Sequence, residues 1–476
     1  ILIYLGMCFC SGLLMLFTEK LFRRNVVHPC FVKEADKIKG LLKSKLTALT
    51  LGAALALTGC SFGSSVENLL SPPKLSEEQT EIYNALVSSV GSGIKLQYPK
   101  GGSYRSAFII EDLDEEESKE AIVFYRNTNE TNSGSIRVNI LDKRNGKWQS
   151  VYDHAGIGTG IDRVMFANLG GSSRKSIIIG YNMLSNEKNM RVYYYEDGIL
   201  YNTFSDNYSS MFTIDMNSDT YSELVVLHPN NEYTGKQAYV SLVTDDGSKV
   251  YESSSVLLNE KSSDFVNVDL GYIGSGTPAI YIDGISDGKL STEIVYCINN
   301  TLRNPLYLSE SEAYSDTIRP EGYICTDIDL DGVVEIPTIS YFPGYSEDSR
   351  NSYIVTEWNI FNNYEIKRKY SSFYSTSEGF CFTLPSRWEG VVTVKPDTST
   401  GDIVFYKFRT DPLNSTEELL RIAVITSEYR DERLANGYTL YKTKDNINYM
   451  YKISDKKNEP LVLTKSEVTN NFYILA

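Results

Sequence analysis

The sequence predicts a mainly β protein, a β-propeller of about five four-stranded blades followed by a small α+β domain. Three observations support this fold class. A nine-residue loop between two apolar runs recurs five times, a tight-turn pair of Asn, Asp or Gly follows about thirty residues after each loop start, and the runs before these turns alternate apolar and polar residues. Four antiparallel strands that recur with a period near fifty residues are typical of propeller blades.

The first 59 residues are interpreted as an upstream segment and a signal peptide. Lysines between residues 33 and 45 precede an apolar run, 46–57, that is too short to span a bilayer. The run ends in Leu57-Thr58-Gly59-Cys60, which resembles the bacterial lipobox. This resemblance implies cleavage before Cys60, lipidation of Cys60 and a protein anchored at the extracytoplasmic face of the cell membrane. Residues 1–17 are a second apolar run, either a membrane segment or sequence upstream of a start codon read as Val32.

The charge and the cysteine content limit the ligands, the compartment and the thiol state that we expect for this protein. The formal net charge is −15; without residues 1–59, which hold eight Lys/Arg and three Asp/Glu, 38 basic and 58 acidic residues leave −20. Such a surface repels the phosphates of nucleic acids and suits an extracytoplasmic protein that binds cations. Cys297, Cys325 and Cys381 lie in apolar, strand-like settings, so we expect buried free thiols, although one disulfide is possible.

A flexible tether and a helix precede the repeats. Residues 60–75 are polar and contain Pro72-Pro73, which predicts a tether. Ser76-Glu77-Glu78-Gln79 resembles a capping box, and apolar residues at helical spacing predict a short amphipathic helix over about 77–90. This helix and the propeller form the predicted domain 76–374.

The five repeat units share one frame. The loops span 112–120, 168–176, 215–223, 269–277 and 327–335, and their first residues lie 56, 47, 54 and 58 positions apart. The turn pairs are Asn145-Gly146, Asp197-Gly198, Asp246-Gly247, Asn299-Asn300 and Asn362-Asn363. In each unit we expect the loop to join the first two strands and the turn to join the last two. Five units could close a ring alone, or the strand-like segment 94–98 could help to seal it.

The fifth loop carries the best candidate metal site. Its acids occupy loop positions 1, 3, 5 and 9, and Gly332 at position 6 allows a sharp bend; the candidate ligands are Asp327, Asp329, Asp331, Val333 and Glu335. Two like charges about 4 Å apart cost roughly 1 kcal/mol even in water. A divalent cation such as calcium would offset this repulsion, and the alternative is a hydrated acidic turn.

Two other loops keep part of this ligand set. They supply the candidates Asp215, Asn217, Asp219 and Glu223 in the third loop and Asp112, Asp114, Glu116 and Glu120 in the first. The second and fourth loops have lost the acids, so metal binding is not expected there. The spacing Asp-x-Asp-x-Asp-Gly-x-x-Glu resembles FG-GAP/VCBS repeats, whose loops bind calcium in propellers such as those of integrin α-subunits. The resemblance covers about 270 residues and implies calcium as the cofactor.

A different pattern begins at residue 375 and defines a C-terminal domain, 375–476. Its first segment, Phe380 to Trp388, resembles the start of PsbP/Mog1-like α+β domains, and an unrelated small α+β domain is the alternative. The pattern predicts strand-like segments at 380–388, 391–394 and 403–408, further strands near 438–441 and 447–453, and a helix that begins near Ser415 and includes Glu418.

The sequence gives no sign of a catalytic site. Only His154 and His228 follow Cys60, and no Gly-x-Ser-x-Gly, His-Glu-x-x-His or Walker loop is present. We therefore expect no enzyme but a calcium-supported surface lipoprotein that binds an unknown protein or glycan and no nucleic acid. The alternatives are an extracytoplasmic enzyme acting on glycans in the propeller funnel, or an assembly partner of other envelope proteins.

Overall fold

A computed structural model describes residues 75–476 apart from 117, 129–134, 185, 231–234, 260–263, 308–314, 349–352, 457 and 476. The predicted signal peptide, Cys60 and most of the predicted tether lie outside these residues. Residues 77–476 form one compact unit. Within the described part of the chain, no helix is both long and apolar enough to cross a membrane.

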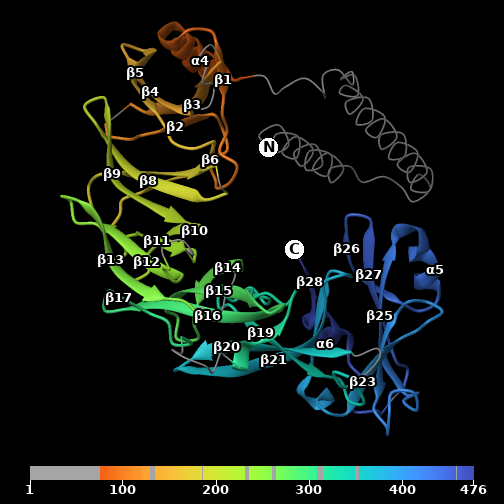
Figure 1. Cartoon of the computed structure of the whole chain (residues 1–476). Coiled ribbons are helices and arrows are strands. Elements are labelled where there is room, and N and C mark those ends of the chain that lie inside the picture. The colour runs from red at the N-terminus through yellow and green to blue at the C-terminus, as the bar shows by residue number, and fades with distance from the viewer. Residues whose placement is uncertain are drawn as a thin grey trace, which may run out of the picture. The chain divides into compact units, whose positions relative to one another are not determined.

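The predicted N-terminal helix is present with the expected bounds. Helix α4 spans Glu77–Val90 and packs on strands β4 (Arg137–Arg144) and β5 (Lys147–Ala155). Ile82 and Leu86 are fully buried, because their spacing of four residues places both on the face that meets the sheet. The helix thus covers the first sheet, where Figure 1 shows it beside β4 and β5.

Five antiparallel sheets follow in chain order, as predicted for propeller blades (Figure 1). The first contains β1 (Ile94–Leu96), β2 (Phe108–Glu111), β3 (Glu120–Asn127), β4 and β5; the second β6 (Gly160–Ala167), β7 (Ser176–Asn182), β8 (Lys188–Glu196) and β9 (Ile199–Tyr208). The third contains β10 (Ser210–Ile214), β11 (Glu223–His228), β12 (Tyr239–Asp245) and β13 (Val250–Leu257); the fourth β14 (Asp264–Tyr272), β15 (Pro278–Ser286), β16 (Lys289–Ile298), β17 (Thr301–Arg303) and β18 (Arg319–Pro320). The fifth contains β19 (Ile336–Tyr341), β20 (Ile354–Asn362), β21 (Glu365–Ser375), β22 (Phe380–Leu384) and β28 (Phe472–Ile474).

The loops and turns of the first three blades have the predicted places. The loop between the first two strands holds residues 112–119, 168–175 or 215–222, and the Asn/Asp turn joins the last two strands. Asn145 has a φ of 51° and Gly146 one of 75°, the left-handed conformation that two-residue hairpins require. The loop and the turn therefore lie at the same end of each of these blades.

The structure corrects three details of the predicted frame. Asp269, Leu270 and Gly271 lie inside β14, so the fourth loop is only residues 273–277; Leu270 pairs with Ile280 and packs on the core. Among the residues that the structure describes, the fifth blade has no first strand, and before its loop an isolated bridge joins Thr326 to Glu335. Strand β1 pairs with β3 of its own blade and does not link the first blade to the last.

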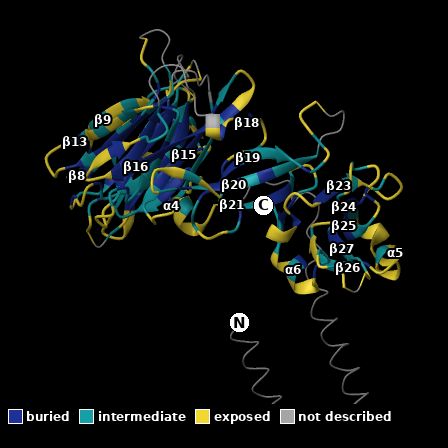
Figure 2. Cartoon of the chain, turned by 90° about the horizontal axis from the view of Figure 1, so that it is seen from below, coloured by how far each residue is buried: buried dark blue, intermediate teal, exposed yellow. Residues whose placement is uncertain are grey.

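Successive sheets pack on one another through separate apolar cores. One core joins the first and second blades around Ile122 and Ile177, the next joins the second and third around Ile178 and Leu224, and a third joins the third and fourth around Val225. A further core joins the fourth and fifth blades. Figure 2 shows the buried residues within the sheets and the exposed residues on the loops that connect strands.

The C-terminal segment forms an antiparallel sheet with short helices. Its strands are β23 (Val392–Pro396), β24 (Ile403–Lys407), β25 (Glu418–Thr426), β26 (Thr439–Lys444) and β27 (Ile447–Ile453), and its helices are α5 (Arg430–Ala435) and α6 (Lys465–Asn470). The predicted helix near Ser415 is wrong, because Glu418 begins strand β25, in which Leu419, Leu420 and Ile422 are buried. The predicted strands are confirmed, with the first segment extended only over 380–384.

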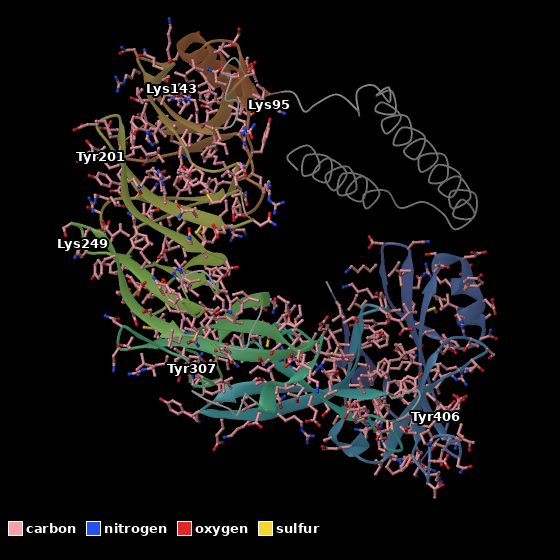
Figure 3. The ribbon with its side chains drawn as sticks, in the orientation of Figure 1. Lys95, Lys143, Tyr201, Lys249, Tyr307 and Tyr406 are labelled. Carbon is pink, nitrogen blue, oxygen red and sulfur yellow. The ribbon has the colours of Figure 1, made fainter. Side chains whose placement is uncertain are left out.

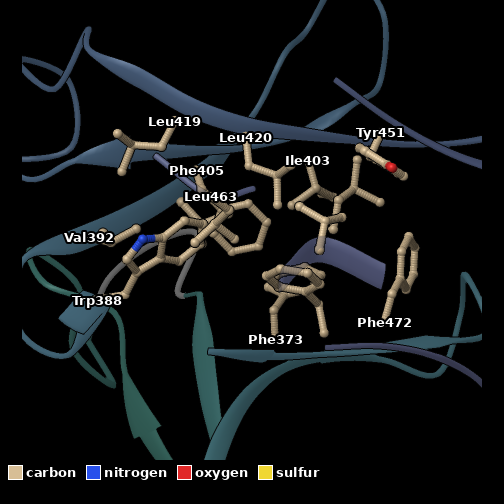
Figure 4. Close-up of a cluster of buried hydrophobic side chains, with 14 of the residues drawn as sticks. Phe373, Trp388, Val392, Ile403, Phe405, Leu419, Leu420, Tyr451, Leu463 and Phe472 are labelled. Carbon is tan, nitrogen blue, oxygen red and sulfur yellow. The ribbon is translucent and has the colours of Figure 1, made fainter. Parts of the chain in front are cut away.

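The C-terminal sheet shares a core with the fifth blade. Phe373 of β21 and Phe382 of β22 pack with Trp388, Phe405 and Phe472 (Figure 4). Strands β22 and β28 extend the fifth sheet beyond β21, so the boundary predicted after residue 374 falls within β21. The prediction of buried free thiols is confirmed for Cys297, Cys325 and Cys381.

Lysines and tyrosines line the last hairpins of the first three blades. Lys143 lies 5.4 Å from the ring centre of Trp148, Tyr201 stacks on Tyr194, and Lys249 lies over Tyr251. Figure 3 labels Lys143, Tyr201 and Lys249 on successive blades. Of these pairs, Tyr194 and Tyr201 face each other across β8 and β9, so cross-strand packing explains part of the tyrosine content.

Candidate metal loops and an adjoining cavity

The three acidic loops are built around a buried glutamate at loop position 9. Each glutamate carboxylate accepts a hydrogen bond from the backbone N–H of the apolar residue at position 2, which is itself buried. The pairs are Leu113 to Glu120 at 2.8 Å, Met216 to Glu223 at 3.0 Å and Ile328 to Glu335 at 3.0 Å. The ninth residue thus closes the loop across its base.

The third and fifth loops also share the conformation of their tips. In the fifth, the two Asp327 carboxylate oxygens accept from the backbone N–H groups of Asp331 and Gly332 at 3.0 and 2.8 Å. In the third, Asp215 accepts from the N–H groups of residues 219 and 220 at 3.0 and 2.9 Å. Position 6 has a positive φ in both, 90° for Gly332 and 79° for Thr220. The first carboxylate is therefore a structural acceptor in each loop.

The first loop gathers three carboxylates. Oxygens of Asp112, Asp114 and Glu120 lie within 4.8 Å of one another. Burial raises the pKa of Glu120 to about 7, and the charges of Asp114 and Asp142 add to the effect. Among the described residues, no lysine or arginine side chain forms an ion pair with these three acids, whose oxygens suit a hard divalent cation. Glu116, a predicted ligand, is exposed and lies outside this group.

The second loop contributes a cation beside this group. Lys175 Nζ lies 2.6 Å from the carbonyl oxygen of Asp112 and 3.5 Å from Glu111 Oε1. Lys175 therefore contacts the backbone of the first loop. Its ion pair is with Glu111, which is not one of the three clustered carboxylates. Asn168 donates to Glu115 Oε1 at 3.2 Å and ties the two loops together.

The third loop does not bring its acids together. Asp215, Asp219 and Glu223 form no carboxylate group within 4.8 Å among the described residues. Asn217 turns its amide nitrogen toward Asp219 Oδ2 at 2.8 Å and toward Asn300 Oδ1 of the next blade at 3.1 Å. The predicted ligands of the third loop instead form hydrogen bonds within the loop and to the fourth blade.

The fifth loop contains an internal cation. Oxygens of Asp327, Asp329 and Glu335 lie within 4.8 Å of one another, as the spacing predicted. The ammonium group of Lys369 from β21 lies 2.8 Å from Asp329 Oδ2, 2.7 Å from Asp331 Oδ2 and 2.7 Å from Glu335 Oε1.

Val333 was also predicted as a ligand of the fifth loop. Its N–H donates to Asp331 Oδ1 at 2.9 Å, and its backbone forms an isolated β-bridge with Tyr272 of the fourth blade.

Sequence spacing missed Lys369, because this residue lies 34 positions after Glu335 and only the strand pairing brings it to the loop.

A cavity of about 380 Å³ lies between the fifth sheet and the segment that follows β22. Its apolar part includes Phe342, Leu384 and Trp388. At its polar part, Arg368 pairs with Glu357 at 3.6 Å and with Glu389 at 2.5 Å, so one guanidinium links the two walls. None of these polar residues was a candidate from sequence, because they come from β20, β21 and the turn after η2 (Ser386–Trp388).

The two histidines occupy packing or surface positions. His154 is exposed at the end of β5 and stacks over Tyr152 with ring centres 6.0 Å apart. His228 is buried at the end of β11, where its ring stacks on Tyr239 at 4.0 Å and Nε2 lies 2.8 Å from Ser241 Oγ. Ser241 Oγ and Asp206 Oδ2, the latter 3.9 Å from Nδ1, flank the His228 ring in the order that acyl transfer uses, but Ser241 is buried, so its hydroxyl is not accessible to a substrate.

Comparison with known proteins identifies no family for this chain. No family model and no curated protein matches the sequence. Among solved structures, the chain is similar to the exotype rhamnogalacturonan lyase YesX, with a TM-score of 0.28, 10% identity and coverage of 67% of this chain and 73% of that one. It is also similar to Sqt1 of Saccharomyces cerevisiae, with a TM-score of 0.29, 9% identity and coverage of 77% and 100%. At these TM-scores the matches carry no argument about function, and the blade architecture rests on the strand order described above.

Proposed function

We propose that this chain is a lipid-anchored, extracytoplasmic binding protein whose blades are stabilised by a divalent cation, calcium being the ion that fits the oxygen ligands. The first loop carries this proposal. It holds three clustered carboxylates, one of them fully buried, and no described basic side chain neutralises them. Carboxylates gathered in this way repel one another unless a cation is bound.

A thermal melt in EDTA and in calcium tests the cation. Calcium should raise the melting temperature by several degrees, because an ion that binds only the folded state stabilises it by about 2.7 kcal/mol at a hundred times its Kd. Asp114→Asn should remove most of this shift. Glu116→Gln is the matched control, since Glu116 is an exposed acid of the same loop outside the cluster. Equal melting temperatures in EDTA and calcium would refute the cation.

The anchor is tested separately, because Cys60 lies outside the described residues. When the full chain is produced in bacteria, the wild-type protein should enter the membrane fraction and carry acyl chains on its new N-terminal cysteine, as the lipobox resemblance implies. Cys60→Ser should leave an uncleaved, unlipidated precursor. Mass spectrometry of both proteins decides between these states, and an unlipidated wild-type N-terminus would remove the anchor from the proposal.

The cavity favours a second function, the binding or processing of a small glycan. It combines apolar walls with two carboxylates and a guanidinium, groups that can hydrogen-bond sugar hydroxyls. Because Arg368 pairs with both glutamates, these acids support binding better than acid–base catalysis. Calorimetry against an oligosaccharide panel, with Arg368→Ala as the variant, tests binding, and release of reducing ends from the same oligosaccharides tests hydrolysis.

A further inference from the structure

Lys369 is the extra residue of a β-bulge in the fifth blade. Trp358 of β20 pairs with Tyr370, and the next residue, Asn359, pairs with Arg368, so Lys369 has no partner in the ladder. A bulge of this kind changes the direction of a side chain relative to the regular strand. Lys369 is only 22% exposed, and its ammonium lies among the acids of the fifth loop.

Lys369 contacts three of the four acidic side chains of the fifth loop. Its three ammonium protons face one oxygen each of Asp329, Asp331 and Glu335, all at 2.7 to 2.8 Å. A calcium ion would need the same oxygens at 2.3–2.6 Å, so the ammonium and the ion exclude each other from this position.

The same bulge recurs in three of the other blades with a different residue. The register shifts at the equivalent place in the first, second and third blades, where the extra residues are Val151, Thr203 and Ser253. The hydroxyls of Thr203 and Ser253 donate to carbonyls of the neighbouring strand, both at 3.1 Å. Val151 packs on the core between the first two blades. The first blade therefore has an acidic loop and an uncharged bulge residue, whereas the fifth has an acidic loop and a lysine.

We infer that Lys369 is the specificity-determining residue of the fifth loop: its ammonium serves as the loop's resident cation and keeps divalent ions out. The inference rests on the proposed function in one respect, that an acidic loop whose carboxylates cluster, as in the first and fifth blades, binds a divalent ion when it lacks the ammonium. The bulge residue thus decides whether a blade depends on dissolved metal, as the first does, or carries its own charge, as the fifth does.

The test counts calcium ions bound to the full chain by calorimetry. Lys369→Met keeps the length of the side chain and removes its charge, and it should add one calcium equivalent to the wild-type number. Adding Asp329→Asn to this variant should remove the extra equivalent. Lys367→Met is the matched control, since Lys367 lies on the same strand, is 53% exposed and pairs only with Glu365 at 3.0 Å. It should leave the number unchanged.

Asp329→Asn in the wild-type background tests the inference without removing the lysine. If the ammonium excludes calcium, this variant binds as many ions as the wild type, and a lost equivalent would overturn the inference. A folded Lys369→Met protein that gains no ion would overturn it as well. If the wild type binds no calcium and Lys369→Met binds one, the cation in the first loop is refuted while the role of Lys369 stands.

Discussion

The acidic loops and the glycine loops hold the blades together in different ways. The acidic first, third and fifth loops close on themselves, through a buried glutamate that accepts a backbone N–H at the loop base. The second and fourth loops lack these acids and bond to the next blade through the backbone. Gly170 N–H donates to Ser222 O at 2.9 Å, and Gly274 N–H donates to Phe361 O at 2.9 Å.

This difference shows why glycine replaces acid in alternate blades. At position 3, where the acidic loops have Asp or Asn, a Cβ on Gly170 would lie 2.1 Å from Thr244 Oγ1, and a Cβ on Gly271 would lie 2.6 Å from Val334 Cγ2. The next blade therefore lies directly against the backbone at these glycines. A loop that must accept a neighbour at this distance cannot also surround an ion with side chains.

The largest effect is expected where a side chain is forced into a glycine loop. Gly170→Ala should lower the free energy of unfolding by about 3 kcal/mol, since the methyl group clashes with the third blade and the φ of 58° is unfavourable for alanine. Gly247→Ala is the control, because Gly247 has a φ of 85° with nothing within 4 Å of a Cβ, and it should cost about 1 kcal/mol. Urea unfolding measures the free energy of unfolding of both variants. Equal decreases would show that the close contact at Gly170 does not contribute to the destabilisation.

Removing one carboxylate charge should change the free energy of unfolding differently in the two acidic loops with clustered carboxylates. In EDTA, Glu335→Gln should destabilise by about 2 kcal/mol, because Lys369 loses a buried partner. Glu120→Gln should be neutral or stabilising by up to about 1 kcal/mol, because it relieves repulsion from Asp114 and keeps an acceptor for the Leu113 N–H. Urea unfolding of both variants provides the measurement. Destabilisation of the same size in both would contradict the difference between the loops.

A smaller effect separates the third loop from the fifth. Thr220 has the same place as Gly332 and a φ of 79°, a conformation that a β-branched residue adopts at a cost. Thr220→Gly should therefore stabilise the protein by about 1 kcal/mol, and Gly332→Thr should destabilise it by at least as much. Differential scanning calorimetry in EDTA compares the two. Destabilisation by Thr220→Gly would mean that the threonine side chain contributes contacts that outweigh its backbone strain.

The sequence predicted correctly those parts of the fold that depend on residue spacing within one element or one turn. Helix α4, the hairpin turns and the loops of the first three blades follow from periodicity and turn chemistry within a few residues. The fourth loop and strand β25 were predicted wrongly for a related reason. Asp269 and Glu418 look like loop or helix-start residues, but Leu270 and Leu420 pair with neighbouring strands and hold these segments extended.

The clustering of carboxylates was predictable from the sequence, whereas the lysine among them was not. Acid spacing located both carboxylate groups that the structure brings together, yet it ranked the fifth loop above the first. The decisive residue, Lys369, is placed by strand register and a bulge, and neither can be seen from the spacing of the acids. The cavity was missed for the same reason, since Glu357, Arg368 and Glu389 meet only after β20, β21 and η2 are assembled.

The smallest effect is expected at the other end of the third blade. Strand β11 begins at Glu223 of the acidic loop and ends at His228, where burial lowers the pKa of the imidazole. The charged groups around it are Asp206, whose Oδ2 lies 3.9 Å from Nδ1, together with Glu252 and Lys236. Because the folded pKa lies below the unfolded value, the unfolded chain binds the proton more readily, and stability should fall as the pH drops from about 7 through the folded pKa.

One proton limits this slope to about 1.4 kcal/mol per pH unit. His228→Gln should remove this contribution between pH 7 and 5 while retaining an amide that can reach Ser241. Urea unfolding at several pH values, compared between wild type and variant in EDTA, isolates the histidine from the loops. A variant with the wild-type slope would place the pH dependence in the acidic loops. Their buried glutamates, with pKa values near 7, act in the opposite sense, since they lose stability as the pH rises.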